Sequence, residues 1–263
     1  MKRYRFFEFE DYHWFPDVLR TGMLDYLRFL IRLLRVYNSI TPVLLEVLEK
    51  TGETQIVDLG SGGGGPVLQV RQNLNLQNKQ VAFILTDKFP NLDAWRYLRE
   101  NTNQQIDFYP TSVDAENVPE TLHGIRTLFS TAHHFRPAQI KAILQASVNQ
   151  KQAICLFDGG DKNWFFLLGS LIVHPVVFFF CTPFLRPFKI SRLVFTYLIP
   201  LIPLSTIWDG CVSLLRLYQP QEFLQLAQSI PTKTYTWKAG KTKNNLGVHV
   251  AYLIGYPNLD TEI

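Results

Sequence analysis

A buried run that ends in an acid and continues into glycines is the part of this chain best suited to bind a ligand. Residues 56–59 have the pattern of a buried strand that contains Asp58, and Gly60, Gly62 and Gly64 follow at alternate positions. Glycines permit tight turns and close approach to the backbone, and the N–H groups of a helix that begins after such a turn favour phosphate or sugar groups. The sequence therefore predicts a nucleotide-like ligand here.

Two other interpretations of this segment remain open. Gly60, Gly62 and Gly65 also satisfy G-x-G-x-x-G, the pattern of nicotinamide and flavin Rossmann domains. A glycine-rich surface loop, in turn, needs no ligand. The acid two residues before the first glycine argues against a dinucleotide enzyme, which usually carries an apolar residue there.

The motif Asp58-x-Gly60-x-Gly62-x-Gly64 resembles the first motif of the class I S-adenosylmethionine-dependent methyltransferases. A second strand, residues 80–87, ends in Asp87 about where a ribose-binding carboxylate is expected. The resemblance covers nearly everything after residue 50 and implies S-adenosylmethionine as cofactor, with an adenine contact from residues 111–115 at the end of a third strand. The implied cofactor-binding residues are Asp58, Gly60, Ser61, Gly62, Gly64, Asp87, Lys88, Asp114 and Ala115.

The elements that must position these residues follow from hydrophobic periodicity. Residues 126–137 predict a fourth strand and its end, residues 137–146 a helix, and residues 153–158 a short buried fifth strand. Segments 232–237 and 247–255 predict an antiparallel pair, with which class I methyltransferases end. We expect an α/β, Rossmann-like sheet of seven mostly parallel strands with an antiparallel last strand. The expected organisation is a helical cap at 1–50 and a methyltransferase domain at 51–263, with a hydrophobic helical insertion at 159–218.

Two adjacent histidines follow the fourth strand, whose end faces the transferred methyl group in the family. Neutral imidazole can remove a proton from a hydroxyl or amine near pH 7, so His133 or His134 is a candidate catalytic base, with Asp158 or Asp161 orienting it. Alternatively, His133 hydrogen-bonds the cofactor or the backbone and His134 only packs. Neighbouring residues of an extended segment point in opposite directions, so we expect no metal site.

The cap is predicted to be helical and amphipathic from about residue 16 to residue 50. Asp25, Arg28, Arg32 and Arg35 have helical spacing and predict a solvated polar stripe or, alternatively, a surface for anionic lipid. N-terminal helices often cover the cofactor in methyltransferases of this type. The candidate acceptor-binding residues are Tyr12, Trp14, Phe15, Arg20, Trp164 and Asp209. For Asp209, the favoured alternative is that it anchors the insertion, together with Gly210, Ser213, Arg216 and Tyr218.

The insertion contains two uncharged runs, residues 164–185 and 193–208, separated by Arg186, Lys189 and Arg192. The first run is long enough to span a bilayer, but the strands on both sides of the insertion belong to one sheet, so the chain must return. A double crossing would carry three bases outward, against the positive-inside tendency. Five prolines also interrupt long helices. We favour short helices that form an apolar lid over the acceptor site, with or without contact to one leaflet of a membrane, over a buried subdomain, a dimer interface or a spanning hairpin.

Composition narrows the function further. Of the 263 residues, 47% are apolar and 18% are charged, against a globular average of about 25% charged, and the net charge is +4. No zinc or nucleic-acid signature is present. Isolated Cys155, Cys181 and Cys211 indicate thiols in a reducing compartment, and the acids within residues 1–11 exclude a signal-peptide core. We expect a cytoplasmic enzyme, peripheral at a membrane, that methylates a lipophilic small molecule or lipid. A non-catalytic lipid-binding protein and a nicotinamide oxidoreductase are the alternatives, and the acceptor atom and oligomeric state stay open.

Overall fold

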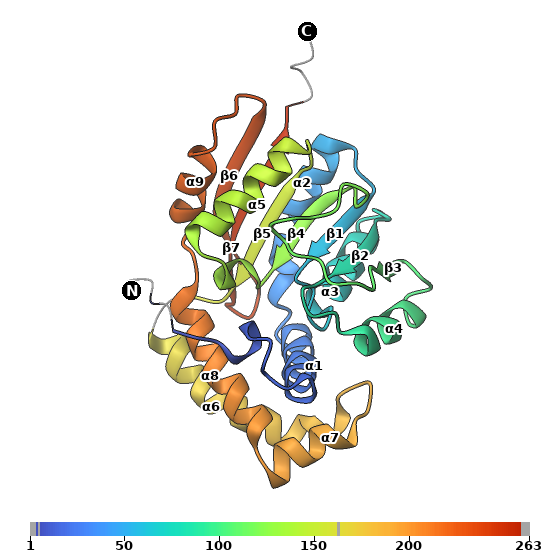
Figure 1. The fold of residues 1–263 in the computed structure, drawn as a ribbon, viewed down its shortest axis with the longest axis vertical. Helices are drawn as coiled ribbons and strands as arrows, with labels where there is room; N and C mark the ends of the chain where they lie inside the picture. The colour runs from blue at the N-terminus through green and yellow to red at the C-terminus, as the bar shows by residue number, and fades with distance from the viewer. Residues whose placement is uncertain (1–3, 5, 162–163, 259–263) are drawn as a thin grey trace.

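A single mixed sheet forms the centre of the computed structural model, which describes residues 4, 6–161 and 164–258, without the side chains of 164–166 and 170. Its seven strands have the order β3-β2-β1-β4-β5-β7-β6 (Figure 1). The pairs among β1 to β5 are parallel, and β7 runs antiparallel to both β5 and β6. The strands are β1 (Gln55–Leu59), β2 (Ala82–Thr86), β3 (Ile106–Phe108), β4 (Ile125–Phe129), β5 (Ile154–Gly159), β6 (Tyr235–Lys243) and β7 (His249–Pro257).

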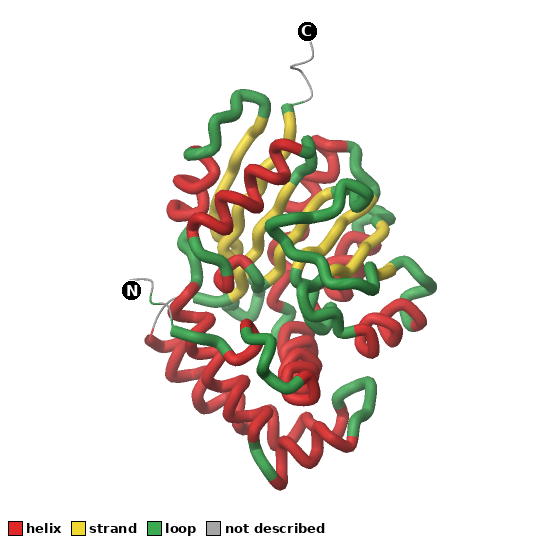
Figure 2. Tube along the Cα trace, in the orientation of Figure 1, coloured by secondary structure: helices red, strands yellow, loops and turns green. Residues whose placement is uncertain are grey.

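Helices cover both faces of the sheet because successive strand residues point to opposite sides. Ile56 and Cys155 belong to one buried cluster, with α2, α3 and α4, whereas Val57 and Leu156 belong to another, with α5 and α9. Figure 2 shows this layering of helices around the sheet. The helices are η1 (Phe9–Asp11), α1 (Asp17–Leu33), η2 (Val36–Ile40), α2 (Thr41–Thr51), α3 (Gly65–Leu76), α4 (Leu92–Glu100), η3 (Ala132–His134), α5 (Pro137–Asn149), α6 (Trp164–Cys181), η4 (Thr182–Phe184), α7 (Ile190–Leu193), η5 (Val194–Leu198), α8 (Leu201–Arg216) and α9 (Pro220–Gln228).

The predicted fold class is confirmed. All seven strands are present, the first five along the chain are parallel, and the chain closes with the antiparallel pair β6–β7. Helical structure precedes β1, and α6 to α8 follow β5 as the insertion. The sheet therefore brings the carboxyl ends of β1, β2 and β4 to one edge, where the ligand is expected.

The insertion packs on the cap as a third, separate core. Phe178 of α6, Leu185 and Ile202 of α8 are buried against α1 residues such as Met23 and Tyr26. Figure 1 shows α1 between the sheet and the layer formed by α6, α7 and α8. The cap is thus covered on one side by the insertion, and it can reach the sheet edge on the other.

Proline breaks the insertion at fewer places than the sequence predicts. Pro175 lies inside α6, an uninterrupted helix of 18 residues, so the expectation of a break there was wrong. The carbonyl that loses its helical donor at Pro175 is that of Leu171, which is 44% exposed and is therefore not enclosed by the protein. The described residues contain one helix long and apolar enough to span a bilayer, residues 167–184, and a second candidate pair, 190–198 with 201–216, is bent by 79°.

The polar stripe of α1 is solvated only at its end. Asp25 is fully buried and Arg28 nearly so, which corrects the expectation that the whole stripe faces water. The reason is the insertion: Arg192 donates to Asp25 with an Nη1 to Oδ2 distance of 3.0 Å, and Arg28 lies 3.2 Å from the other carboxylate oxygen. Arg32 and Arg35 are exposed, and Arg35 lies past the helix end with φ of 48°.

Candidate functional site

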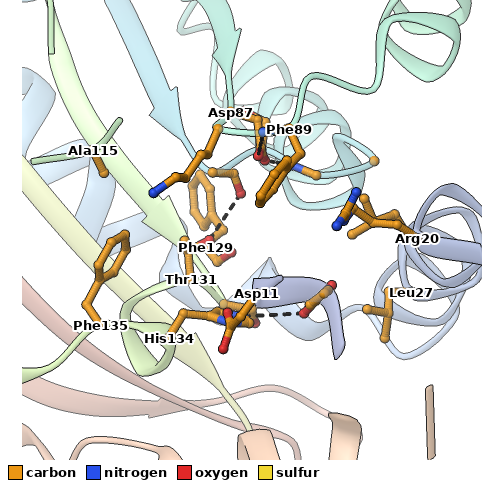
Figure 3. A pocket seen from close by; sticks show the side chains of 18 of the residues that line it. Asp11, Arg20, Leu27, Asp87, Phe89, Ala115, Phe129, Thr131, His134 and Phe135 are labelled. Atoms are coloured by element: carbon orange, nitrogen blue, oxygen red, sulfur yellow. Dashed lines mark hydrogen bonds and ion pairs between the residues drawn. The ribbon is translucent and has the colours of Figure 1, made fainter. Parts of the chain in front are cut away.

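A cavity of about 690 Å³ lies at the carboxyl ends of β1, β2 and β4. Figure 3 shows residues from distant parts of the chain around it, among them Asp11, Arg20, Asp87, Thr131 and His134. The glycine turn after β1, the ends of β2 and β4, and the loop at 113–116 form one wall. Residues 6–12 and α1 form the other. Its size is that of an ordinary small-molecule site.

The glycine turn and Asp87 form the polar floor of the cavity. Gly60 and Gly62 line it with φ of 72° and 50°, a conformation that favours glycine. The Gly62 N–H donates to Asp87 Oδ2 and the Phe89 N–H to Oδ1, each at 2.8 Å. Burial raises the pKa of the Asp87 carboxyl, while these two donors lower it. The carboxylate is therefore fixed in orientation at the cavity wall, with lone pairs left for a ligand.

Two glycines of the run are required by packing against the cap. A Cβ at Gly63 would lie 2.8 Å from the backbone oxygen of Leu24, and one at Gly65 would lie 2.7 Å from the Cα of Arg28. Since real Cβ atoms do not approach backbone so closely, α1 can rest on the turn only if these residues are glycines. The sequence interpretation assigned the whole run to a ligand and missed this second reason.

Asp58 lies beneath the cavity and does not line it. Its carboxyl is 1% exposed and accepts a hydrogen bond from Thr127 Oγ1 at 2.8 Å. Burial raises the pKa of Asp58 to about 7, against the opposing effect of its hydrogen bonds. Ser61 lines the cavity, whereas Gly64 does not. In this conformation Asp58 supports the turn from behind.

The adenine side of the predicted site is an exposed rim. Lys88, Asp114 and Ala115 all line the cavity, and Lys88 Nζ lies 3.3 Å from Asp114 Oδ2. β3 ends at Phe108, so Asp114 does not stand at the strand end as expected. It lies in the loop that follows, which is held by a hydrogen bond from the Val113 N–H to the Asp87 carbonyl oxygen at 2.9 Å.

The two histidines lie side by side. Their segment is the 3₁₀ turn η3, and the ring centroids are 4.4 Å apart, so the expectation that they point in opposite directions was wrong. His133 is 5% exposed, does not line the cavity, and places Nδ1 3.2 Å from Asp158 Oδ1. Asp161 instead lies 2.7 Å from the Nζ of Lys241. Of the two acids considered in the sequence, Asp158 is therefore the one that contacts His133.

His134 lines the cavity and is surrounded by carboxylates. Its Nδ1 lies 2.7 Å from Glu8 Oε2 and 2.8 Å from Asp11 Oδ1, and Nε2 lies 3.5 Å from Glu10 Oε1. Burial lowers the pKa of His134, but the nearby acids raise it by more, so that the pKa lies well above its ordinary value. An imidazolium has no lone pair for a proton, so His134 is not a base near pH 7 in this arrangement.

Among the described residues, one group could hold a metal ion: Glu8, His133 and His134 place ligand atoms within 4.8 Å of one another. Positive charge is already supplied there without a metal. Arg216 Nη1 lies 2.8 Å from Glu8 Oε2, the same oxygen that contacts His134. We therefore interpret the group as an ion-pair network, and the expectation of no metal site stays a prediction.

The wall formed by residues 6–12 is the part of the site that the sequence did not reveal. Helix α8 holds it: the Asp209 carboxylate accepts hydrogen bonds from the Phe9 and Glu10 N–H groups at 2.9 and 3.2 Å. Ser213 Oγ donates to Glu8, and Arg216 Nε donates to the Phe6 carbonyl at 3.0 Å. Asp209 does not line the cavity, so these residues anchor the N-terminal segment here. The cluster of acids at residues 8–11 is visible in the sequence, but nothing local to it indicates Arg216 as its partner.

The candidate acceptor-binding residues separate into two places. Tyr12 and Arg20 line the main cavity, where the Arg20 guanidinium lies 4.3 Å from the ring centroid of Phe89. Trp14 and Phe15 line a second cavity of about 380 Å³, which has almost entirely apolar walls. The side chain of Trp164 lies outside the described part. The two cavities share Phe7, so the N-terminal segment divides them.

Comparison with known proteins yields a fold likeness. No protein-family model and no curated protein sequence matches the chain. Similar solved structures include the pyocyanin biosynthetic protein PhzM (12% identity, 84% of this chain and 54% of that chain, TM-score 0.48) and human N-acetylserotonin methyltransferase in complex with SAM (13%, 89% and 56%, 0.48). A third is magnesium protoporphyrin IX methyltransferase from Synechocystis with bound SAH (12%, 81% and 81%, 0.42). The chain spans about half the length of the first two.

The sheet itself identifies the fold class. Its strand order, with β7 inserted antiparallel between β5 and β6, is that of class I methyltransferases. At the identities found, the likeness to solved structures concerns the fold alone.

Proposed function

We propose that this protein transfers a methyl group from S-adenosylmethionine to a lipophilic small molecule or lipid. The observation that carries the proposal is the cavity that joins the glycine turn after β1 to the fixed carboxylate of Asp87. The cofactor fits the residues present: a carboxylate accepts both ribose hydroxyls, and the backbone at Gly60 and Gly62 has no side chain to obstruct a ligand. A nicotinamide oxidoreductase and a non-catalytic lipid-binding protein are the alternatives.

The residues of the chain have few chemical tasks in such a reaction. The cofactor supplies an electrophilic methyl group, and the protein has to align the acceptor with it and exclude water. Residues 6–12 and α1 close the cavity opposite the sheet edge. For an acceptor that carries a proton, His133 with Asp158 is the remaining candidate base. His133 does not line the cavity, so it acts directly only after the adjoining His134 ring moves aside.

The cavity walls on the cap side favour a lipophilic acceptor. The main cavity adjoins a second cavity lined by Phe7, Phe9, Trp14, Phe15, Pro16, Leu19, Leu201, Leu204, Ser205 and Trp208. Burial of a hydrocarbon chain against such walls is favourable, and the walls have few groups that could bind a charged polymer. We further propose that the enzyme works in the cytoplasm, where the thiols of Cys155, Cys181 and Cys211, which form no disulfide, would stay reduced.

Calorimetric titration with S-adenosylmethionine, its demethylated product and NADH tests the cofactor. Asp87→Ala should weaken binding of the methyl donor by about 1.5 to 3 kcal/mol, because hydrogen bonds to a charged group are lost. Asp114→Ala, at the exposed rim of the same cavity, is the matched control and should change affinity less. Binding of NADH without binding of the methyl donor would refute the proposal.

A second measurement separates the enzyme from the non-catalytic alternative. Purified protein is incubated with methyl-labelled donor and a total lipid extract, and label is sought in the organic phase. Transfer that depends on the protein supports the acceptor class. Donor binding with no label in any lipid or lipophilic fraction would favour the non-catalytic alternative.

A further inference from the structure

Exposed apolar side chains are concentrated at one end of the molecule. Within the described residues, all large apolar side chains that are exposed lie in segments 4–33 or 164–208, except Leu76 and Leu246. In the insertion they include Ile172, Phe180, Leu198 and Leu204, exposed by 71, 65, 77 and 61%. Scattered exposed leucines are normal, whereas a patch of this extent marks a surface that meets something other than water.

The polar groups of the same helices point inward. Arg192, Asp209 and Arg216 are 2–4% exposed and are bonded to the cap or to the N-terminal segment. A helix of a water-exposed surface places charge outward and apolar groups inward. Here α6, α7, η5 and α8 show the reverse, which is the arrangement favoured beside hydrocarbon, where charged groups are costly and face the protein interior.

The ends of the insertion limit how it can meet a bilayer. β5 precedes it, β7 pairs with β5 after it, and both ends therefore stay beside the sheet. α6, α7 and α8 form one layer at the end of the molecule far from the C-terminus (Figure 1). A layer that lies flat against the cap presents its outer face to a single leaflet, and no sheet residue has to cross the membrane.

Exposed aromatic and basic residues occur in the same segments as the apolar face. Trp14, Trp208 and Tyr197 are exposed by 65, 41 and 40%, and amphipathic rings of this kind favour the headgroup level. Arg32 and Arg186 are also exposed. Arg186 belongs to the loop between η4 and α7, and Arg28 donates a hydrogen bond to its carbonyl oxygen, which places this loop beside α1. These bases complement anionic phospholipid headgroups.

The second cavity lies between this face and the reaction site. Leu201, Leu204 and Trp208 line it and also belong to the exposed face. On its other side Phe7 separates it from the cofactor cavity. A hydrocarbon chain could therefore leave the leaflet along α8 and place its polar end beside the N-terminal wall without entering water.

We propose that the outer face of α6, α7, η5 and α8 inserts into one leaflet of an anionic phospholipid bilayer, with the second cavity taking the hydrocarbon chain of the acceptor from that leaflet. The proposal that this face docks on a membrane rests on the insertion alone. The proposal that the second cavity takes the acceptor's hydrocarbon chain rests on the proposed function.

Vesicle flotation with phosphatidylcholine and phosphatidylglycerol at 3:1 tests the docking on the full chain. Phe180→Glu and Leu204→Glu should each lower vesicle partition by about 10-fold or more, since each replaces buried hydrocarbon contact by a charge. Leu76→Glu and Leu246→Glu change equally exposed leucines elsewhere and should leave partition unchanged. Partition that is equal in all four variants and the original protein would overturn the proposal.

Two further measurements keep the result interpretable. Lipids brominated in their acyl chains should quench Trp208 but not the buried Trp95, so Trp208→Phe should lose part of the quenching. Sedimentation in the absence of lipid tests a second copy as the occupant: face variants that only dissociate a dimer, with unchanged vesicle partition, would overturn the proposal. Donor affinity, measured in the same variants, reports on the proposed function separately, because none of the four sites lines the cofactor cavity.

Discussion

Asp58 gives the sharpest test of how this site is built. The structure buries it behind the glycine turn, whereas the family resemblance implies that it contacts the donor. The carboxyl is 1% exposed, and burial raises its pKa to about 7. In the unfolded chain the pKa would be about 3.9. Between these values the folded state binds more protons than the unfolded state, so the free energy of unfolding falls as pH rises.

The size of the effect follows from the difference of about three pH units. At 1.36 kcal/mol per unit, ionisation of Asp58 costs the fold about 4 kcal/mol at pH 8, of which about 2.5 kcal/mol develops between pH 5 and pH 8. Asp58→Asn keeps an oxygen that accepts from Thr127 Oγ1 and carries no charge. Relative to the original protein, the variant should therefore gain about 2.5 kcal/mol between pH 5 and pH 8, or about 5 to 8 °C in Tm.

The assay is thermal unfolding of both proteins without cofactor, from pH 5 to pH 8, with donor titration at pH 7.5. Asp114→Asn, at the exposed rim of the same cavity, serves as control and should show no such divergence with pH. If Asp58 also contacts the donor, as the family resemblance implies, the stabilised variant should bind the donor more weakly. Parallel Tm profiles for the original and Asp58→Asn would refute the burial argument, whatever the binding result.

Three further outcomes are expected. Gly65→Ala should destabilise the fold by about 1 to 3 kcal/mol because the added Cβ meets the α1 backbone. Gly169→Ala, with no atom near the added Cβ, should be neutral or stabilising by up to about 1 kcal/mol. Equal changes in Tm would contradict the packing argument. His134→Gln should remove a stabilisation that is present at low pH and lost as pH rises through the raised pKa, so urea unfolding curves of the two proteins should converge at alkaline pH; a constant difference would argue against the ion-pair network. His133→Gln should lower the single-turnover methyl-transfer rate by about 10² to 10⁴ with donor affinity retained, and an unchanged rate would remove this histidine from the mechanism.

Most of the sheet could be predicted from the sequence because its strands, except β3, carry a local signal. The buried run at β5 and the acid and glycines after β1 appear within a few residues, and the strand period of two makes them visible. The segment around Asp114 was the exception. Its acid is six residues past β3, and the loop that returns it to the cavity depends on a backbone hydrogen bond to Asp87.

The cap side of the site could not be predicted in the same way. Glu8 and Arg216 meet across more than 200 residues, and neither has a local pattern that names the other. The burial of Asp25 likewise depends on Arg192, which belongs to the insertion. A charge at helical spacing on an isolated helix predicts a solvated stripe, and only the tertiary contact reverses that prediction.

The glycine run shows why a correct prediction can rest on an incomplete reason. Gly60 and Gly62 line the cavity, as a ligand-binding turn requires. Gly63 and Gly65 line the same cavity and are also confined by the backbone of α1, so these glycines satisfy a packing demand as well. Loss of donor binding in Gly65→Ala would therefore not distinguish a lost ligand contact from a displaced cap. Only substitutions whose side chains face the cavity, such as those at Asp87, can separate the two causes.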